Sequence, residues 1–195
     1  MIKIENRLFF ILAFLMASVV ALSNYLVQFP VKYYALHDFL TYGAFSYPIA
    51  FFITDLSNRR YGKKNAKKIV YTGFVIGVLL TLFFSTNFED LISIRIAIGS
   101  GTAFLFAQLI DVNIFDKLRH KAWFAAPLMS SLVGSTVDTF LFFSISFYNT
   151  GVNWVTLAIG DLFVKIFVAL LMLIPFRLLL NHIKEFSSSK KNFNV

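Results

Sequence analysis

The chain has 195 residues, with 18 Lys and Arg against 10 Asp and Glu, so its formal net charge is +8. It is 58% hydrophobic, only 14% charged and free of cysteine. A soluble domain of this size could not bury so much apolar surface, and the missing thiols exclude a disulfide framework and a thiolate metal site. These properties predict an all-α, polytopic membrane protein.

Six apolar segments follow one another along the chain, separated by short connections. They cover residues 8–28, 39–57, 69–86, 91–112, 123–147 and 155–177. A helix rises about 1.5 Å per residue, so about 20 apolar residues cross a hydrocarbon core of ~30 Å. We expect a single six-helix transmembrane domain at 1–185 and a flexible cytoplasmic tail at 186–195. The first segment is long and lacks a cleavage site, so we expect it to be retained as a span.

The basic residues predict the orientation of these spans. Fifteen of the 18 lie near the N-terminus, in the second and fourth loops and at the C-terminal end, whereas the opposite loops contain only Lys32. Cytoplasmic loops carry an excess of Lys and Arg, so both termini are expected in the cytoplasm. The basic surplus is therefore a topology signal for a bilayer partner, and no nucleic-acid partner is expected.

Four charged residues share one level inside the predicted spans, in the outer half of the bilayer, where charges are expensive and usually functional. Arg95 is in the fourth span, Asp138 is in the fifth, and Asp161 and Lys165 are in the sixth at the spacing of an intrahelical ion pair. At about 1.5 Å per residue, all four lie roughly 7 to 16 Å from the outer ends of their spans. Two interpretations remain open: a polar pocket that opens outward, and an ion-pair network that only holds three helices together.

Other residues of the candidate substrate site lie at the same level or beside it. Asn24 is in the outer part of the first span, and Pro48 interrupts the helical hydrogen bonding of the second span. The remaining candidates are two aromatic residues next to Pro48 and two serines on the helix face of Asp138, namely Phe45, Tyr47, Ser131 and Ser135.

Three further features concern packing. Gly73 and Gly77 have the GxxxG spacing that favours close helix contact. The run Gly99–Ser100–Gly101 would let another helix or a ligand approach closely. Asp55, at the end of the second span, is interpreted as a partner for the bases of the loop that follows.

The sequence contains no recognisable catalytic set. All three histidines, His37, His120 and His182, fall outside the predicted spans, and no HExxH, CxxC, P-loop or GxSxG motif occurs. We therefore predict a protein that is not an enzyme and that needs no cofactor or metal.

Several stretches together resemble one family, the queuosine precursor transporters, or VUT family, which are six-span proteins of the bacterial inner membrane. The matching stretches are SNYLVQFPV, GAFSYP, TDLSNRRYG, RIA at 95–97, AQLIDVNIFDKLR, WFAAP, SSLVGSTVDTFLFFSISF and GDLFVK. They occur in order and cover every predicted span except the third.

The resemblance implies a multi-pass inner-membrane protein that imports 7-deazaguanines, the nitrile and aminomethyl precursors of the tRNA base queuosine. It also implies a fold similar to the substrate-binding subunits of energy-coupling-factor vitamin importers, which bind ligand near the outer face. On this view Asp138 accepts two neighbouring donors of the base, Arg95 donates to its carbonyl or keeps Asp138 ionised, and Phe45 and Tyr47 stack on the ring. The alternative is a membrane-embedded binding subunit for another small heterocycle or vitamin that needs a separate ATPase. The sequence leaves an energising partner and a homo-oligomer open.

Overall fold

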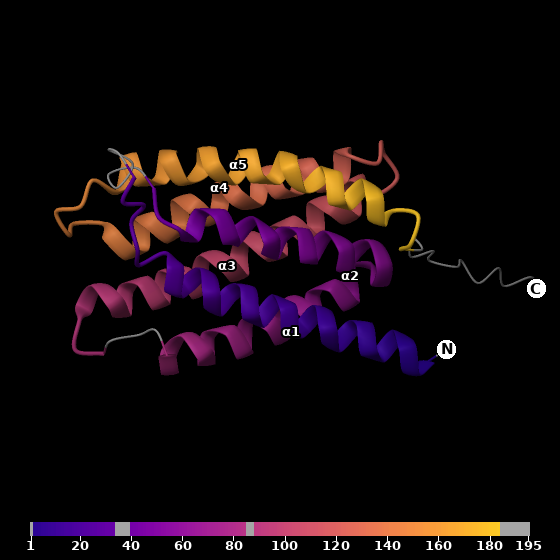
Figure 1. The fold of residues 1–195 in the computed structure, drawn as a ribbon, viewed down its shortest axis with the longest axis horizontal. Coiled ribbons are helices and arrows are strands. Elements are labelled where there is room, and N and C mark those ends of the chain that lie inside the picture. Colours follow the sequence, from indigo (N-terminus) through magenta and orange to yellow (C-terminus); the bar gives the residue numbers. More distant parts are fainter. Residues whose placement is uncertain (1, 34–39, 85–87, 184–195) are drawn as a thin grey trace, which may run out of the picture.

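The computed structural model describes residues 2–33, 40–84 and 88–183, and these residues form five helices. The helices are α1 (Ile2–Leu26), α2 (Gly43–Phe84), α3 (Leu91–Leu118), α4 (Ala125–Phe147) and α5 (Trp154–Leu179). Their long axes follow one common direction (Figure 1). All five are long and apolar enough to cross a membrane, so the chain is a multi-pass membrane protein.

Helix α2 is a folded-back pair of helical arms. Its 42 residues include Gly62, whose φ of 74° and ψ of 169° are not helical. Near one end of α1, Ser23 bonds to Ser46 over 2.8 Å, and Asn24 donates to Thr81 over 2.8 Å. In a straight helix, Ser46 and Thr81 would be about 52 Å apart. The arms 43–61 and 63–84 therefore run in opposite directions, as the purple and magenta parts of α2 show (Figure 1).

We expected a loop between the second and third predicted spans, and this expectation is wrong. Residues 58–61 and 63–68 are helical, so α2 contains both spans and the basic stretch between them. Lys, Arg and Ala are good helix formers, and the reversal needs only one residue with positive φ. Gly62 supplies it, because glycine adopts positive φ without the steric cost of a Cβ atom.

The two ends of the helix bundle differ in composition. The start of α1, the turn at Gly62, the 119–124 connection and the end of α5 lie together (Figure 1), and we call this the basic end. The opposite end contains residues 27–33, 40–42, 88–90 and 148–153. There Asp90 caps α3 by accepting from the backbone amide of Ser93 over 2.9 Å, and Asn153 caps α5. At this end the chain also pairs with itself, through an isolated antiparallel bridge between Pro30 and Thr41.

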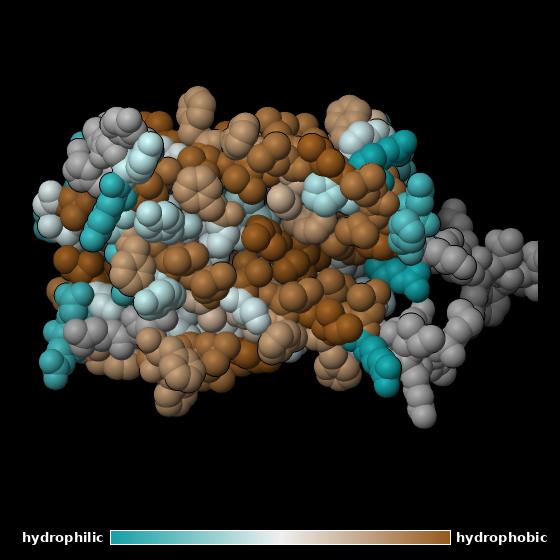
Figure 2. Space-filling model, in the orientation of Figure 1, coloured by the Kyte–Doolittle hydropathy of each residue, from teal (hydrophilic) through white to brown (hydrophobic). Residues whose placement is uncertain are grey.

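The outer face of the bundle is suited to lipid. On the face shown in Figure 2, apolar residues form a broad band, and hydrophilic residues gather at the two ends. Large side chains such as Phe83 (82% exposed) and Phe163 (75%) point away from the protein. The abundant phenylalanine thus supplies both lipid-facing surface and core, where Phe51, Phe104 and Phe143 are almost fully buried.

Close helix contacts depend on small residues, as the GxxxG spacing predicted. A Cβ atom on Gly73 would collide with the side chain of Met16, and one on Gly77 would lie 2.7 Å from Val20. The second arm of α2 therefore approaches α1 closely. Gly99 makes a similar approach to Ser146 of α4. In lipid, the burial of apolar side chains contributes little free energy to helix association, so close packing of this kind is one of its main sources.

We predict that Gly73→Ala lowers thermal stability in detergent, by about 1–3 kcal/mol, because the new methyl group overpacks the α1–α2 contact. Gly101→Ala is the matched control, because a Cβ atom there would meet its nearest neighbour, Phe74, at an ordinary 3.6 Å. Equal melting temperatures for the two variants would show that the α1–α2 contact is not tight.

Candidate functional site

Three of the four predicted intramembrane charges form one buried cluster. The ammonium nitrogen of Lys165 lies 2.8 Å from Oδ2 of Asp138 and 2.6 Å from Oδ2 of Asp161. Thr139 donates to Asp161 over 2.8 Å and accepts from Lys165 over 3.1 Å. The three charged residues are at most 3% exposed. We call them the charged triad, and with two acids and one base it carries a formal charge of −1.

Arg95 does not belong to this triad. Its guanidinium donates to the backbone carbonyl of Ile145 over 2.9 and 3.1 Å and to that of Tyr148 over 2.8 Å. These carbonyls are at the C-terminal end of α4, where they lack helical partners and where a cation is favourable. The expectation that Arg95 holds Asp138 ionised is therefore wrong, because Lys165 takes that place.

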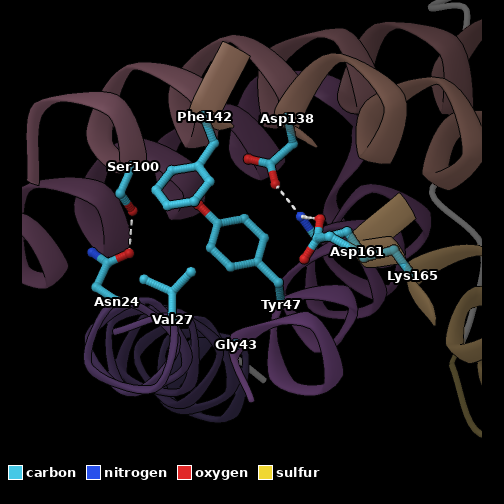
Figure 3. Close-up of a pocket in the computed structure, with 9 residues that line it drawn as sticks. All are labelled: Asn24, Val27, Gly43, Tyr47, Ser100, Asp138, Phe142, Asp161 and Lys165. Carbon is cyan, nitrogen blue, oxygen red and sulfur yellow. Dashed lines mark hydrogen bonds and ion pairs between the residues drawn. The ribbon is translucent and has the colours of Figure 1, made fainter. Parts of the chain in front are cut away.

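A small cavity lies against the triad, between α1, α2, α3, α4 and α5. Its lining residues are Asn24, Val27, Gly43, Tyr47, Ser100, Asp138, Phe142, Asp161 and Lys165 (Figure 3). The volume is about 10 Å³, which is roughly room for one water molecule. The structure thus shows this site in a closed form.

Two aromatic rings fill the middle of the site. Tyr47 and Phe142 lie between the Asn24–Ser100 hydrogen bond and the charged triad (Figure 3). The Lys165 nitrogen is 4.9 Å from the centre of the Tyr47 ring, a cation–π distance. Phe45, in contrast, is 47% exposed and is not among the lining residues of this cavity, so its contact with the substrate stays a prediction.

Sequence reasoning missed Phe142, Ser100, Val27 and Gly43 as lining residues. Phe142 is one helical turn after Asp138, so the 3.6-residue period could have identified it. Ser100 lies in the Gly99–Gly101 run that was expected to admit a close neighbour.

Two buried polar atoms of this site, Oδ1 of Asp138 and the hydroxyl of Tyr47, have no hydrogen-bond partner at good distance and angle among the described residues. The Tyr47 hydroxyl lies near both Asp138 and Ser100, so these groups face the same small space. Leaving a buried polar atom without a partner costs about 1–3 kcal/mol. The site therefore offers one free carboxylate oxygen and one free hydroxyl beside two aromatic rings, an arrangement that can take a flat polar ligand.

The two predicted serines lie farther along α4, outside the cavity. Ser131 donates to Oδ2 of Asp55 over 3.4 Å, and its neighbour Ser130 donates to Oδ1 over 3.0 Å. Asp55 is thus held by α4, and its expected pairing with the basic loop is wrong. Ser135 lies between Ser131 and Asp138 in sequence and is fully buried with no hydrogen-bond partner in the described structure.

A wider groove lies next to the cavity, at the end of the bundle that is opposite the basic end. Its volume is about 340 Å³, and it shares Val27 with the cavity. Gln28, Thr41, Asp90 and Phe147 also line it. Sites for small molecules commonly measure about 300–1,000 Å³. The groove is in that range, whereas the cavity below it is closed.

An apolar helical bundle with a charged interior site beneath a groove defines the class of membrane transport proteins. The family model described as "Putative vitamin uptake transporter" matches residues 41–180. The chain belongs to this family, whose members are transporters and not enzymes.

Similar proteins carry more specific names. The chain is 34% identical to the "Probable queuosine precursor transporter" of Haemophilus influenzae, with 88% of this chain and 85% of that protein covered. It is 31% identical to the "Queuosine precursor transporter" of Escherichia coli, with 91% and 88% covered. A relative from Bacillus subtilis is 30% identical, with 68% of each chain covered. No solved structure matches the chain, so its likeness to the energy-coupling-factor subunits stays a prediction.

We predict that Lys165→Met lowers folded yield and thermal stability severely, by about 3–5 kcal/mol, because it leaves two buried carboxylates without their cation. The double variant Lys165→Met with Asp161→Asn should recover part of the lost stability. The triple variant that also carries Asp138→Asn should recover more. Lys117→Met, at an exposed position on α3, is the control. Losses that simply add, as measured by thermal unfolding in detergent, would show that the triad is not coupled.

Proposed function

We propose that this protein is an inner-membrane importer of 7-deazaguanine queuosine precursors, the 7-cyano and 7-aminomethyl compounds used for tRNA queuosine synthesis or salvage. The observation that carries the proposal is the unpartnered Oδ1 of Asp138, buried beside the Tyr47 and Phe142 rings. The names of the similar transporters from Haemophilus influenzae and Escherichia coli support it.

The chemistry of the substrate complements this site. A 7-deazaguanine carries a ring N–H and an exocyclic amine side by side, next to a carbonyl. The free oxygen of Asp138 accepts one of these donors, and a bond to a carboxylate is about twice as strong as a neutral one. The Tyr47 hydroxyl donates to the carbonyl, and the two rings stack on the base at ~1–3 kcal/mol, a value taken from stacked nucleobases.

Import requires the closed cavity to open toward the groove. Gly43 and Val27 separate cavity from groove, and a Cβ atom on Gly43 would lie 2.9 Å from that of Val27. Moving the end of α1 away from the start of α2 widens the cavity on the side of the groove. The substrate then enters from the end opposite the basic end, and closure returns the two rings toward the positions shown in Figure 3.

Helix α2 and the basic end support one orientation of the importer in the membrane. The 42 residues of α2 would extend about 63 Å if straight, about twice the thickness of the hydrocarbon core, so we infer that each folded-back arm crosses the membrane once. With six crossings, the start of α1 and the end of α5 are at the same end of the bundle, and its excess of Lys and Arg supports a cytoplasmic position for that end. The groove then faces the periplasm.

We predict that Asp138→Asn weakens substrate binding by at least about tenfold, because the amide removes the charge and half of the acceptors at nearly the same shape. Binding is measured by calorimetry on purified protein, with thermal unfolding as the check on folding. Asp116→Asn, on the surface of α3, is the control. Unchanged affinity for both precursors would make Asp138 a purely structural partner of Lys165.

The orientation is tested with reporter fusions. A periplasm-active reporter fused after Phe88 or Asn149 should be active, and one fused after Lys64 or at the C-terminus should be inactive. The reason is that the first two positions are at the end with few bases and the other two at the basic end. An active C-terminal fusion would reverse the orientation and the side from which the groove opens.

A further inference from the structure

A second group of buried charges lies between the cavity and the basic end. Asp55 on the first arm of α2 and Asp111 on α3 are 2% and 0% exposed. Asn58, one turn after Asp55, donates to the carbonyl of Val112, the residue after Asp111, over 2.9 Å, so the two acids lie on adjoining stretches of α2 and α3. Asp55 accepts from Ser130 and Ser131. Neither oxygen of Asp111 has a hydrogen-bond partner at good distance and angle in the described structure, and the nearest donor is again Ser130. We call Asp55 and Asp111 the acidic pair.

No base neutralises this pair. Among the described residues, no Lys, Arg or His forms an ion pair with either carboxylate. On the side of the basic end, Arg119 donates to the backbone and side-chain oxygens of Asn58 and to Asp116. On the other side, Lys165 is held by the charged triad.

One further base, Arg59, follows Asp55 by one helical turn and lines the pocket at the basic end together with Arg119 and His120. The other described groups that contact the pair are uncharged. Ser130 and Ser131 face it from α4, and α5 presents apolar side chains, Met172 and Phe176 among them, to the small cavity beside Asp55. Two carboxylates in a membrane interior, with only serine hydroxyls as donors and no ion-pair partner among the described residues, favour the binding of a cation.

A neighbouring amide indicates which cation the pair binds. Gln108, one turn before Asp111 on α3, is fully buried, and its Nε2 has no partner in the described structure. Its Oε1 accepts from Thr54, the residue before Asp55, over 2.5 Å. The free group of Gln108 is therefore an N–H donor, which is not a metal ligand, one helical turn from Asp111. The cavity beside Asp55 measures only about 10 Å³, so it cannot take a heterocycle.

We propose that Asp55 and Asp111 form a proton-binding site that couples substrate import to the proton gradient. The inference rests on the proposed function, and it adds the energy source. The chain also provides a connection between the two sites. Ser131, Ser135 and Asp138 follow one face of α4 over about 10 Å, and Ser135 is buried with a hydroxyl that has no partner among the described residues. The acidic pair is thus linked along one helix to the substrate site.

The test uses the full chain in liposomes with labelled 7-cyano-7-deazaguanine. Substrate exchange without any ion gradient measures transport itself, and accumulation under an inward pH gradient measures coupling. A pH-sensitive dye inside the liposomes records proton entry. With one proton per substrate, a difference of one pH unit supports about tenfold accumulation.

The wild-type protein should exchange substrate, accumulate it under the pH gradient and admit protons with it. Asp111→Asn and Asp55→Asn should still exchange substrate but lose gradient-driven accumulation. Asp116→Asn, an acid-to-amide change at a surface position on the same helix as Asp111, should behave like the wild type.

Several outcomes would overturn the inference. They are net substrate uptake without proton entry in the wild type, accumulation driven by a sodium gradient instead, and amide variants that still accumulate substrate under the pH gradient. If the variants do not fold, the dye signal of the wild type alone decides the question. A wild-type protein that does not exchange the substrate at all would instead contradict the proposed function.

Discussion

The ammonium group of Lys165 sits between two carboxylates in a part of the protein where each unpaired charge would cost several kcal/mol. This requirement fixes α4 and α5 relative to each other, because Asp138 comes from one helix and Asp161 from the other. It also determines the chemistry of the cavity. Oδ2 of Asp138 and Oδ2 of Asp161 both bond to Lys165. Oδ1 of Asp138 is left as an acceptor for a ligand, and the Tyr47 ring of α2 lies against the ammonium group of Lys165.

Neutral hydrogen bonds hold the other half of the bundle. Asn24 donates to Thr81 on the second arm of α2 and accepts from Ser100 on α3, and Ser23 bonds to Ser46 on the first arm. Lipid is as apolar as the helix surfaces, so interhelical hydrogen bonds and close packing replace the hydrophobic drive of soluble proteins. The same contacts place α2 in two arms around α1, with Gly73 and Gly77 allowing the approach.

The charged triad and the acidic pair differ in how their charges are balanced. The triad contains its own cation and is completed by Thr139, whereas the acidic pair has only serine hydroxyls as donors. A balanced cluster can stay in place while a ligand comes and goes. An unbalanced pair must gain or lose a cation, and this makes it suited to a step of the transport cycle. Both sites contact α4, so a shift of that helix would change the distances between charged groups in each of them.

The amino-acid sequence alone determined the membrane class and identified five of the residues that line the cavity, Asn24, Tyr47, Asp138, Asp161 and Lys165. Hydropathy and helical spacing are local properties, and they are sufficient for these conclusions. Only the tertiary structure decided which charges pair. Arg95 and Lys165 are both long cations near Asp138 in depth, but Arg95 reaches the carbonyl ends of α4 while Lys165 points inward. The direction of a side chain around its helix, the fold-back at Gly62 and the meeting of Asp55 with Asp111 depend on contacts between segments far apart in sequence, which no local pattern specifies.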